Sequence, residues 1–163
     1  MVDARRFLCA AAIAGSALLP LVAGLDAAPA RAASAEDQVA HRQDEMKKQG
    51  KAIKALMTFA KGQGGTLAEV AQNAEIIHQI SLTVPDLFPA GTAVGVDDSG
   101  AKPEIWTEWD HFKQLAAAVT KESATLSQLA RAASADPAAV SAQVAAVGKA
   151  CGACHESYRA RKN

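Results

Sequence analysis

Two cysteines and a histidine near the end of the chain have the types and the spacing to bind a porphyrin. Cys151, Cys154 and His155 form a C-x-x-C-H motif, the attachment signature of c-type haem. In that chemistry two thiols add to the two vinyl groups of one porphyrin, and the adjacent imidazole ligates the iron. On a helix the three residues stand at i, i+3 and i+4, so their side chains project from one face. The motif therefore predicts one haem c, bound covalently through Cys151 and Cys154, with His155 as an iron ligand.

Two other uses of such a motif have less support. A structural zinc site normally has a second pair of ligands, and the only other cysteine is Cys9. A thioredoxin-like redox pair lies near a βαβ pattern, and the chain carries no strand signals.

The composition favours helices. Alanine dominates, only 4% of the 163 residues are aromatic, and β-branched runs are few, which is typical of an α-helical domain. The 17 basic and 17 acidic residues balance, so nothing indicates nucleic-acid binding.

The first residues are typical of a secretory signal. Arg5 and Arg6 form a positive start, residues 7–25 are mostly apolar, and an A-x-A cleavage site ends at Ala32. We therefore expect residues 1–32 to be removed on export to the periplasm, since bacterial c-type haem is attached outside the cytoplasm.

A permanent membrane anchor is the alternative, but Pro20, Gly24 and Asp26 interrupt the apolar run. Cys9 would be lost with the signal peptide. Residues 33–163 would then form a single domain.

Capping motifs and apolar periodicity predict four amphipathic helices. Capping boxes at Ser34 and Thr66 begin the first two, and Asp136 is an N-cap for the fourth. The third carries the cleanest apolar seam, from Ile105 to Ala133. The first three expected helices span residues 34–61, 66–82 and 103–133, and the fourth runs from residue 136 to Lys162.

The connections between these helices are short, except for residues 83–102. Loops of that length are usually functional or disordered, but a crossover between two helices, held by Leu87 and Phe88, explains it without any function. The pattern predicts an all-α, antiparallel up-down-up-down four-helix bundle with the covalent haem site in its C-terminal part.

Met46 is the thioether best placed to reach the iron opposite His155. In the expected bundle the end of the fourth helix lies beside the start of the first, and both residues lie roughly 12–18 Å along their helices from that end. We expect Met46 to be the sixth iron ligand, with a simple packing role as the alternative. Met57 is expected in the core, and His78 is a competing ligand.

Two arginines and several aromatic residues belong to the same end. Arg42, one turn before Met46, is expected either to reach a haem propionate or to be solvated. Arg159 is expected either to lie over the proximal face of the haem or to complement the dipole of the last helix. His41 and His111 are expected to face solvent. The candidate pocket walls, or ordinary core residues, are Phe88, Trp106, Trp109 and Tyr158.

Specific segments of the chain resemble the class II cytochromes c, the family of cytochrome c prime and its low-spin relatives. The resemblance covers the exported part of the chain, and a C-terminal haem motif is itself distinctive of this family. It rests on Arg42-Gln43, Met46-Lys47-Lys48-Gln49-Gly50, Ala60-Lys61-Gly62, Lys102-Pro103-Glu104-Ile105-Trp106 and Cys151 to Arg159.

The resemblance implies a four-helix bundle with His155 as the proximal ligand. It also implies that the position of Met46 decides between a low-spin, methionine-ligated iron and a high-spin, five-coordinate one. Arg42 matches the family's propionate-binding arginine, and Arg159 matches its basic residue after the haem motif. Family members are often homodimers through their first two helices.

These observations predict a periplasmic electron-transfer protein, not an enzyme, that meets redox partner proteins and has no permanent membrane anchor. The alternative within the same family is a five-coordinate cytochrome that binds nitric oxide or carbon monoxide. A haem-free helical interaction module, in which the C-x-x-C-H motif is accidental, is a third hypothesis.

Overall fold

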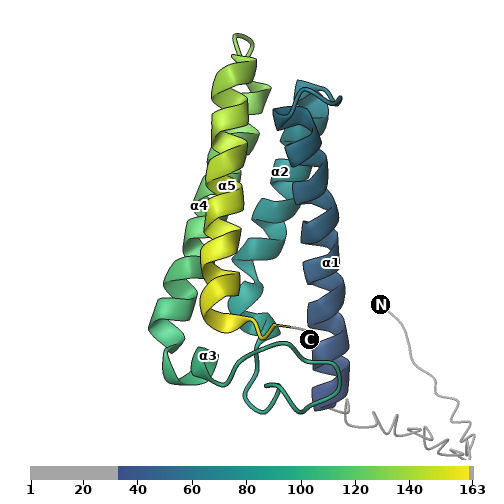
Figure 1. Cartoon of the computed structure of the whole chain (residues 1–163), viewed down its shortest axis with the longest axis vertical. Helices are drawn as coiled ribbons and strands as arrows, with labels where there is room; N and C mark the ends of the chain where they lie inside the picture. Colours follow the sequence, from purple (N-terminus) through teal and green to yellow (C-terminus); the bar gives the residue numbers. More distant parts are fainter. Residues whose placement is uncertain (1–32, 162–163) are drawn as a thin grey trace, which may run out of the picture. The chain divides into compact units, whose positions relative to one another are not determined.

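The computed structural model describes residues 33–161, which belong to one compact unit of the chain. The expected signal peptide, residues 1–32, lies outside the described residues. Four long helices make up most of the unit: α1 (Ala35–Ala60), α2 (Leu67–Leu82), α4 (Trp109–Arg131) and α5 (Pro137–Tyr158). Both α1 and α4 pack against α2 and α5, which closes the bundle (Figure 1). The predicted all-α four-helix bundle is confirmed.

Local signals in the sequence set the starts of the helices. The Ser34 hydroxyl accepts from the Asp37 amide at the start of α1, and Thr66 does the same for Glu69 at the start of α2. Both are complete capping boxes. Asp136 accepts from two amides at the start of α5. All three predicted N-caps are therefore confirmed.

The predicted third helix is interrupted. A short helix, α3 (Glu104–Thr107), ends at Glu108, whose backbone leaves the helical region with φ −115° and ψ 36° before α4 begins. The helix also ends at Arg131, so Ala133 is exposed outside it. The prediction of one continuous helix over 103–133 is wrong: at the break, Glu108 accepts a hydrogen bond from Tyr158 of α5, a contact that periodicity does not report. The fourth helix also ends earlier than predicted, at Tyr158.

The segment between α2 and α3 runs across the end of the bundle where α5 finishes (Figure 1). It starts with a 3-10 turn, Val84–Leu87. Further along, the Lys102 amide donates to the Tyr158 carbonyl (3.0 Å), and the Ala160 amide donates to the Gly100 carbonyl (2.9 Å). The loop is thereby tied to the end of the helix that carries the C-x-x-C-H motif.

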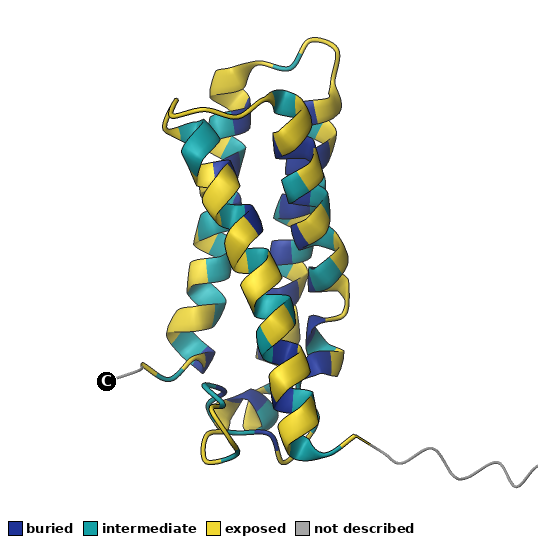
Figure 2. Cartoon of the chain, turned by 90° about the vertical axis from the view of Figure 1, so that its right-hand side faces the viewer, coloured by how far each residue is buried: buried dark blue, intermediate teal, exposed yellow. Residues whose placement is uncertain are grey.

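Buried side chains follow the inward faces of the helices (Figure 2). One cluster fills the bundle away from α3, and a second lies at the α3 end around Phe112 and Tyr158. Met57 belongs to neither: its side chain is 41% exposed, so its predicted core position is wrong. The two clusters contribute the apolar burial that stabilises the fold.

Candidate haem-binding site

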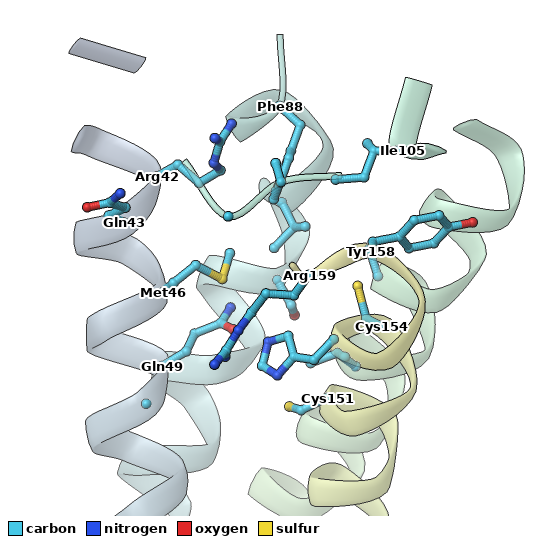
Figure 3. Close-up of a pocket in the computed structure, with 18 of the residues that line it drawn as sticks. Arg42, Gln43, Met46, Gln49, Phe88, Ile105, Cys151, Cys154, Tyr158 and Arg159 are labelled. Atoms are coloured by element: carbon cyan, nitrogen blue, oxygen red, sulfur yellow. The ribbon is translucent and has the colours of Figure 1, made fainter. Parts of the chain in front are cut away.

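The three motif residues share one cavity. Cys151, Cys154 and His155 lie in the last two turns of α5 and line a cavity of about 480 Å³ (Figure 3). Both cysteines are half-buried and free, with no disulfide between them. The helical spacing expected from the sequence therefore brings two thiols and one imidazole to a single hollow.

The cavity wall is mainly apolar, as a porphyrin requires. Side chains from α1, α2, α4 and the loop contribute to it alongside α5. A mostly hydrophobic pocket with a few placed polar groups is the usual form of a cofactor site. The apolar side chains that line it include Ile53, Ile77, Val84, Phe88, Ile105, Phe112, Ala116 and Val119.

Met46 lines the same cavity from the facing helix. It projects from α1, is half-buried, and points into the hollow (Figure 3). The competing histidine is elsewhere: His78 does not line the cavity, and its Nδ1 lies 3.1 Å from the Thr120 carbonyl oxygen. Methionine ligation of the iron stays a prediction, and Met46 is the thioether available for it.

The motif residues have shifted acidities. Partial desolvation first, and the positive charge of Arg159 second, lower the pKa of His155. The imidazole is therefore neutral near pH 7, which is the form that binds a metal. Burial raises the pKa of Cys151 and raises that of Cys154 to about 11, so both sulfurs remain thiols.

Arg42 is buried, and its guanidinium donates hydrogen bonds to the loop between α2 and α3. Its Nη1 donates to the Leu87 carbonyl (3.2 Å) and to Thr92 Oγ1 (2.8 Å), and its Nη2 donates to the Thr92 carbonyl and to Ser99 Oγ, both at 2.9 Å. The guanidinium also lies 4.5 Å from the ring centre of Phe88. Desolvation lowers its pKa.

The alternative of a solvated Arg42 is therefore wrong, because only 4% of its surface is exposed. The side chain lines the cavity, but all four of its terminal N–H donors are used by the loop. A propionate contact stays a prediction, and only Nε–H remains to make it in this arrangement.

Tyr158 connects the haem-binding end of α5 to the helix break. Its hydroxyl donates to Glu108 Oε2 (2.9 Å) and lies 2.7 Å from His111 Nδ1. Burial, reinforced by the Glu108 carboxylate, raises the pKa of Tyr158 to about 12. Since Tyr158 donates its single proton to Glu108, His111 must present Nδ1–H to the hydroxyl. His111 is exposed, as expected, but is not purely a solvent-facing residue.

The other predicted wall residues divide into two groups. Phe88 lines the cavity directly, whereas Trp106 and Trp109 do not. Trp106 supports the wall from behind, because its Nε1 donates to the Phe88 carbonyl (3.0 Å). Trp109 stacks on Phe112, with ring centres 5.4 Å apart.

Arg159 lies at the cavity, beyond the end of α5 (Figure 3). It forms an isolated β-bridge with Ala101, so the backbone of the loop fixes its position. Its charge reaches His155, as the lowered pKa of that imidazole records. His41 is exposed on α1 and does not line the cavity.

Three residues with roles at this end were missed by sequence reasoning. Thr92 and Ser99 accept hydrogen bonds from Arg42, and Lys102 Nζ donates to the carbonyls of Glu156 and Ser157 at the end of α5. These contacts join residues at least 50 positions apart, so no local sequence motif predicts them. Gln49 is a fourth: its Nε2 atom is buried without a hydrogen-bond partner and the residue lines the cavity.

Over residues 33–161, no three or more histidine, cysteine or acidic side chains gather to hold a metal ion on their own. The described residues thus give no support to the zinc alternative. Within the same part of the chain, no helix has the length and apolar character to cross a bilayer.

The fold and the site together define a class. A four-helix bundle whose last helix presents C-x-x-C-H to an apolar cavity is a haem-binding bundle of the cytochrome type. The chain belongs to the cytochrome c′ family, whose model, described as Cytochrome C′, matches residues 37–159. It is therefore a haem protein of that family, and the resemblance seen in the sequence is confirmed.

Relatives and solved structures agree with this assignment. A cytochrome c′ of Pararhodospirillum photometricum is 39% identical over 127 residues, which cover 78% of this chain and 99% of the relative. A cytochrome c-556 of Agrobacterium tumefaciens (strain II Chrys) is 36% identical over 126 residues, covering 77% of this chain and 98% of the relative.

Two solved structures are also similar. One is a cytochrome c′ described as having an unusual ligand-controlled dimer dissociation, with a TM-score of 0.72 and 28% identity, covering 80% of this chain and all of that one. The other is a nitric oxide complex of a variant of cytochrome c prime from Alcaligenes xylosoxidans, with a TM-score of 0.70, 30% identity and the same coverage.

Proposed function

We propose that the protein is a periplasmic electron carrier rather than an enzyme. One haem c is held by thioether bonds to Cys151 and Cys154, and His155 and Met46 are its axial iron ligands. The observation that carries the proposal is that Met46 on α1 and the motif residues on α5 line one cavity (Figure 3). The haem iron supplies the redox chemistry by passing between its ferric and ferrous states.

The protein's own residues set the conditions for that chemistry. The apolar wall favours contact with the porphyrin over water, and His155 is held neutral by partial desolvation and by Arg159. Arg42 is a buried positive charge at the cavity. Such a charge favours the ferrous state, which carries one positive charge less than the ferric state, and so raises the reduction potential.

The coordination is tested by the absorption spectrum of the purified oxidised protein. A low-spin spectrum with the weak long-wavelength band of a methionine–ferric iron bond supports the proposal. In Met46→Ala this band should disappear and the iron should become high-spin. Met57→Ala is the matched control, because it removes an exposed methionine from the same helix. A Met46→Ala spectrum identical to the wild type would refute Met46 as a ligand.

The alternative function is binding of nitric oxide or carbon monoxide at a five-coordinate iron. The observation that favours it is the similar solved structure with bound nitric oxide. Adding carbon monoxide to the reduced wild-type protein separates the two functions. A rapid spectral change supports an open iron, and no change supports a closed, methionine-ligated one.

We further propose export through residues 1–32 and assembly as a homodimer through α1 and α2. Large apolar side chains stay exposed on these helices, namely Met57, Ile76 and Leu82, at 41%, 45% and 53%. Sedimentation velocity of the wild type and of Ile76→Lys tests the dimer, since a buried lysine would weaken it. A wild type that sediments as a monomer would contradict the dimer. N-terminal sequencing of the periplasmic product tests the cleavage after Ala32.

A further inference from the structure

Gln49 carries an unsatisfied hydrogen-bond donor in the cavity. Its Nε2 atom is shielded from solvent and has no hydrogen-bond partner in the protein. A buried amide without a partner is destabilising, and most such groups in native proteins are satisfied. Gln49 lines the same cavity as Met46 (Figure 3), so a group bound in that cavity can supply the missing partner.

Apart from the three motif residues, which are assigned to the haem, the other neutral polar side chains of the wall already have partners. Gln43 Nε2 donates to the Asp98 carbonyl (2.9 Å), and Ser81 Oγ donates to the His78 carbonyl (2.8 Å). The Tyr158 hydroxyl donates to Glu108. Gln49 is therefore the neutral donor of the described cavity wall that is left for a bound group.

The position of Gln49 indicates which bound group it meets. It follows Met46 by three residues on α1, so the two side chains leave the helix on the same side. Arg42, which the family resemblance matches to a propionate, lies seven residues before Gln49, or about 10 Å along the helix axis. Along α1, Gln49 thus lies nearer to Met46, the residue proposed to ligate the iron, than to Arg42.

We propose that Gln49 determines ligand specificity by donating a hydrogen bond from Nε2 to a diatomic ligand bound to the iron on the α1 side. The bond forms when such a ligand takes the axial position assigned to Met46. It favours ligands whose outer atom accepts a hydrogen bond. The inference rests on the proposed haem site, but it does not require Met46 to be the ligand in the resting protein.

Carbon monoxide is the probe, applied to the reduced, haem-loaded Met46→Ala protein, where the iron is open. A donor to the outer oxygen lowers the C–O stretching frequency, because it draws electron density from the iron into the ligand. Adding Gln49→Leu should raise this frequency and speed carbon monoxide dissociation about fivefold, the effect of one lost hydrogen bond. Gln49→His, which restores an N–H donor, should bring both values back toward those of the parent.

The matched control is Gln43→Leu in the same background. It makes the same chemical change on the same helix and cavity, but its amide already bonds to Asp98. It should leave the C–O frequency unchanged. An unchanged frequency and dissociation rate in Gln49→Leu would overturn the inference, and so would an equal shift in Gln43→Leu.

Failure of the proposed function gives different results. A purified protein without haem would refute the site and the inference together. If the reduced wild type binds carbon monoxide directly, only Met46 ligation is refuted, and the Gln49 comparison is then made in the wild type. If Met46→Ala fails to retain haem, Met46→Leu, which keeps the side-chain volume but offers no sulfur, takes its place as the open-iron background.

Discussion

Arg42 and Thr92, fifty residues apart in the sequence, are joined by two hydrogen bonds. Arg42 Nη1 donates to Thr92 Oγ1 at 2.8 Å, and Nη2 donates to the Thr92 carbonyl at 2.9 Å. Both residues are buried, at 4% and 1% exposure. This pair fastens the long loop to α1 beside the cavity, so the loop is part of the site's framework.

Replacing Arg42 by lysine should destabilise the protein by about 3 kcal/mol, because a lysine cannot reproduce the fork of bonds to the loop and remains a buried charge. Urea unfolding of the holoprotein measures the change. Arg131→Lys is the matched control: Arg131 is exposed, pairs with Glu75 at 3.4 Å, and should lose less than about 1 kcal/mol. Equal losses in the two variants would contradict the structural role of Arg42.

Tyr158 should make the stability of the folded protein decrease at alkaline pH. Its pKa is raised from 10.0 to about 12, so the folded state holds the proton more tightly than the unfolded state. Its contribution to stability is full below pH 10 and is lost as the pH rises toward about 12. Unfolding free energies measured across this range should fall with pH in the wild type.

The variant Tyr158→Phe isolates this effect. It removes the hydroxyl that joins Glu108 and His111 and should lower stability at pH 8 by about 1–2 kcal/mol. The same variant should show a flatter stability curve above pH 10. If wild type and variant lose stability in parallel there, the Tyr158 proton is not responsible.

Lys102 should stabilise the end of the helix that carries the motif. Its Nζ donates to the Ser157 carbonyl at 2.9 Å and to the Glu156 carbonyl at 3.3 Å, groups that α5 itself cannot satisfy. Lys102→Met should cost about 1 kcal/mol in thermal or urea unfolding. Lys113→Met is the control, because Lys113 makes only a surface pair with Asp110 and should change stability by less than about 0.5 kcal/mol.

The covalent attachment makes a prediction for mass spectrometry. Cys151→Ser and Cys154→Ser should each leave one thioether bond, and the double variant should lose its haem on denaturation. Cys9→Ser should leave the denatured mature protein with its full haem mass, because Cys9 belongs to the expected signal peptide. Haem retained by the denatured double variant would rule out attachment through these two sulfurs.

Local signals in the sequence were enough to predict the features that depend on neighbours within one or two helical turns. The caps at Ser34, Thr66 and Asp136 join groups two or three residues apart, and the C-x-x-C-H face follows from helical geometry alone. The four-helix pattern followed from such local signals. The family resemblance also rests on short segments, the C-x-x-C-H motif and Arg42 to Gly50, and it indicated the correct family.

Packing in three dimensions sets which of several equivalent positions on a helix face the cavity. Met46 and Met57 share the apolar periodicity of α1, yet Met46 lines the cavity and Met57 is 41% exposed. The burial of Arg42, the break at Glu108 and the free amide of Gln49 also depend on distant segments. Such contacts depend on how the helices and the loop pack in space. The periodicity of a sequence reports only neighbours a few residues apart, so it cannot predict a contact between residues that are fifty positions apart.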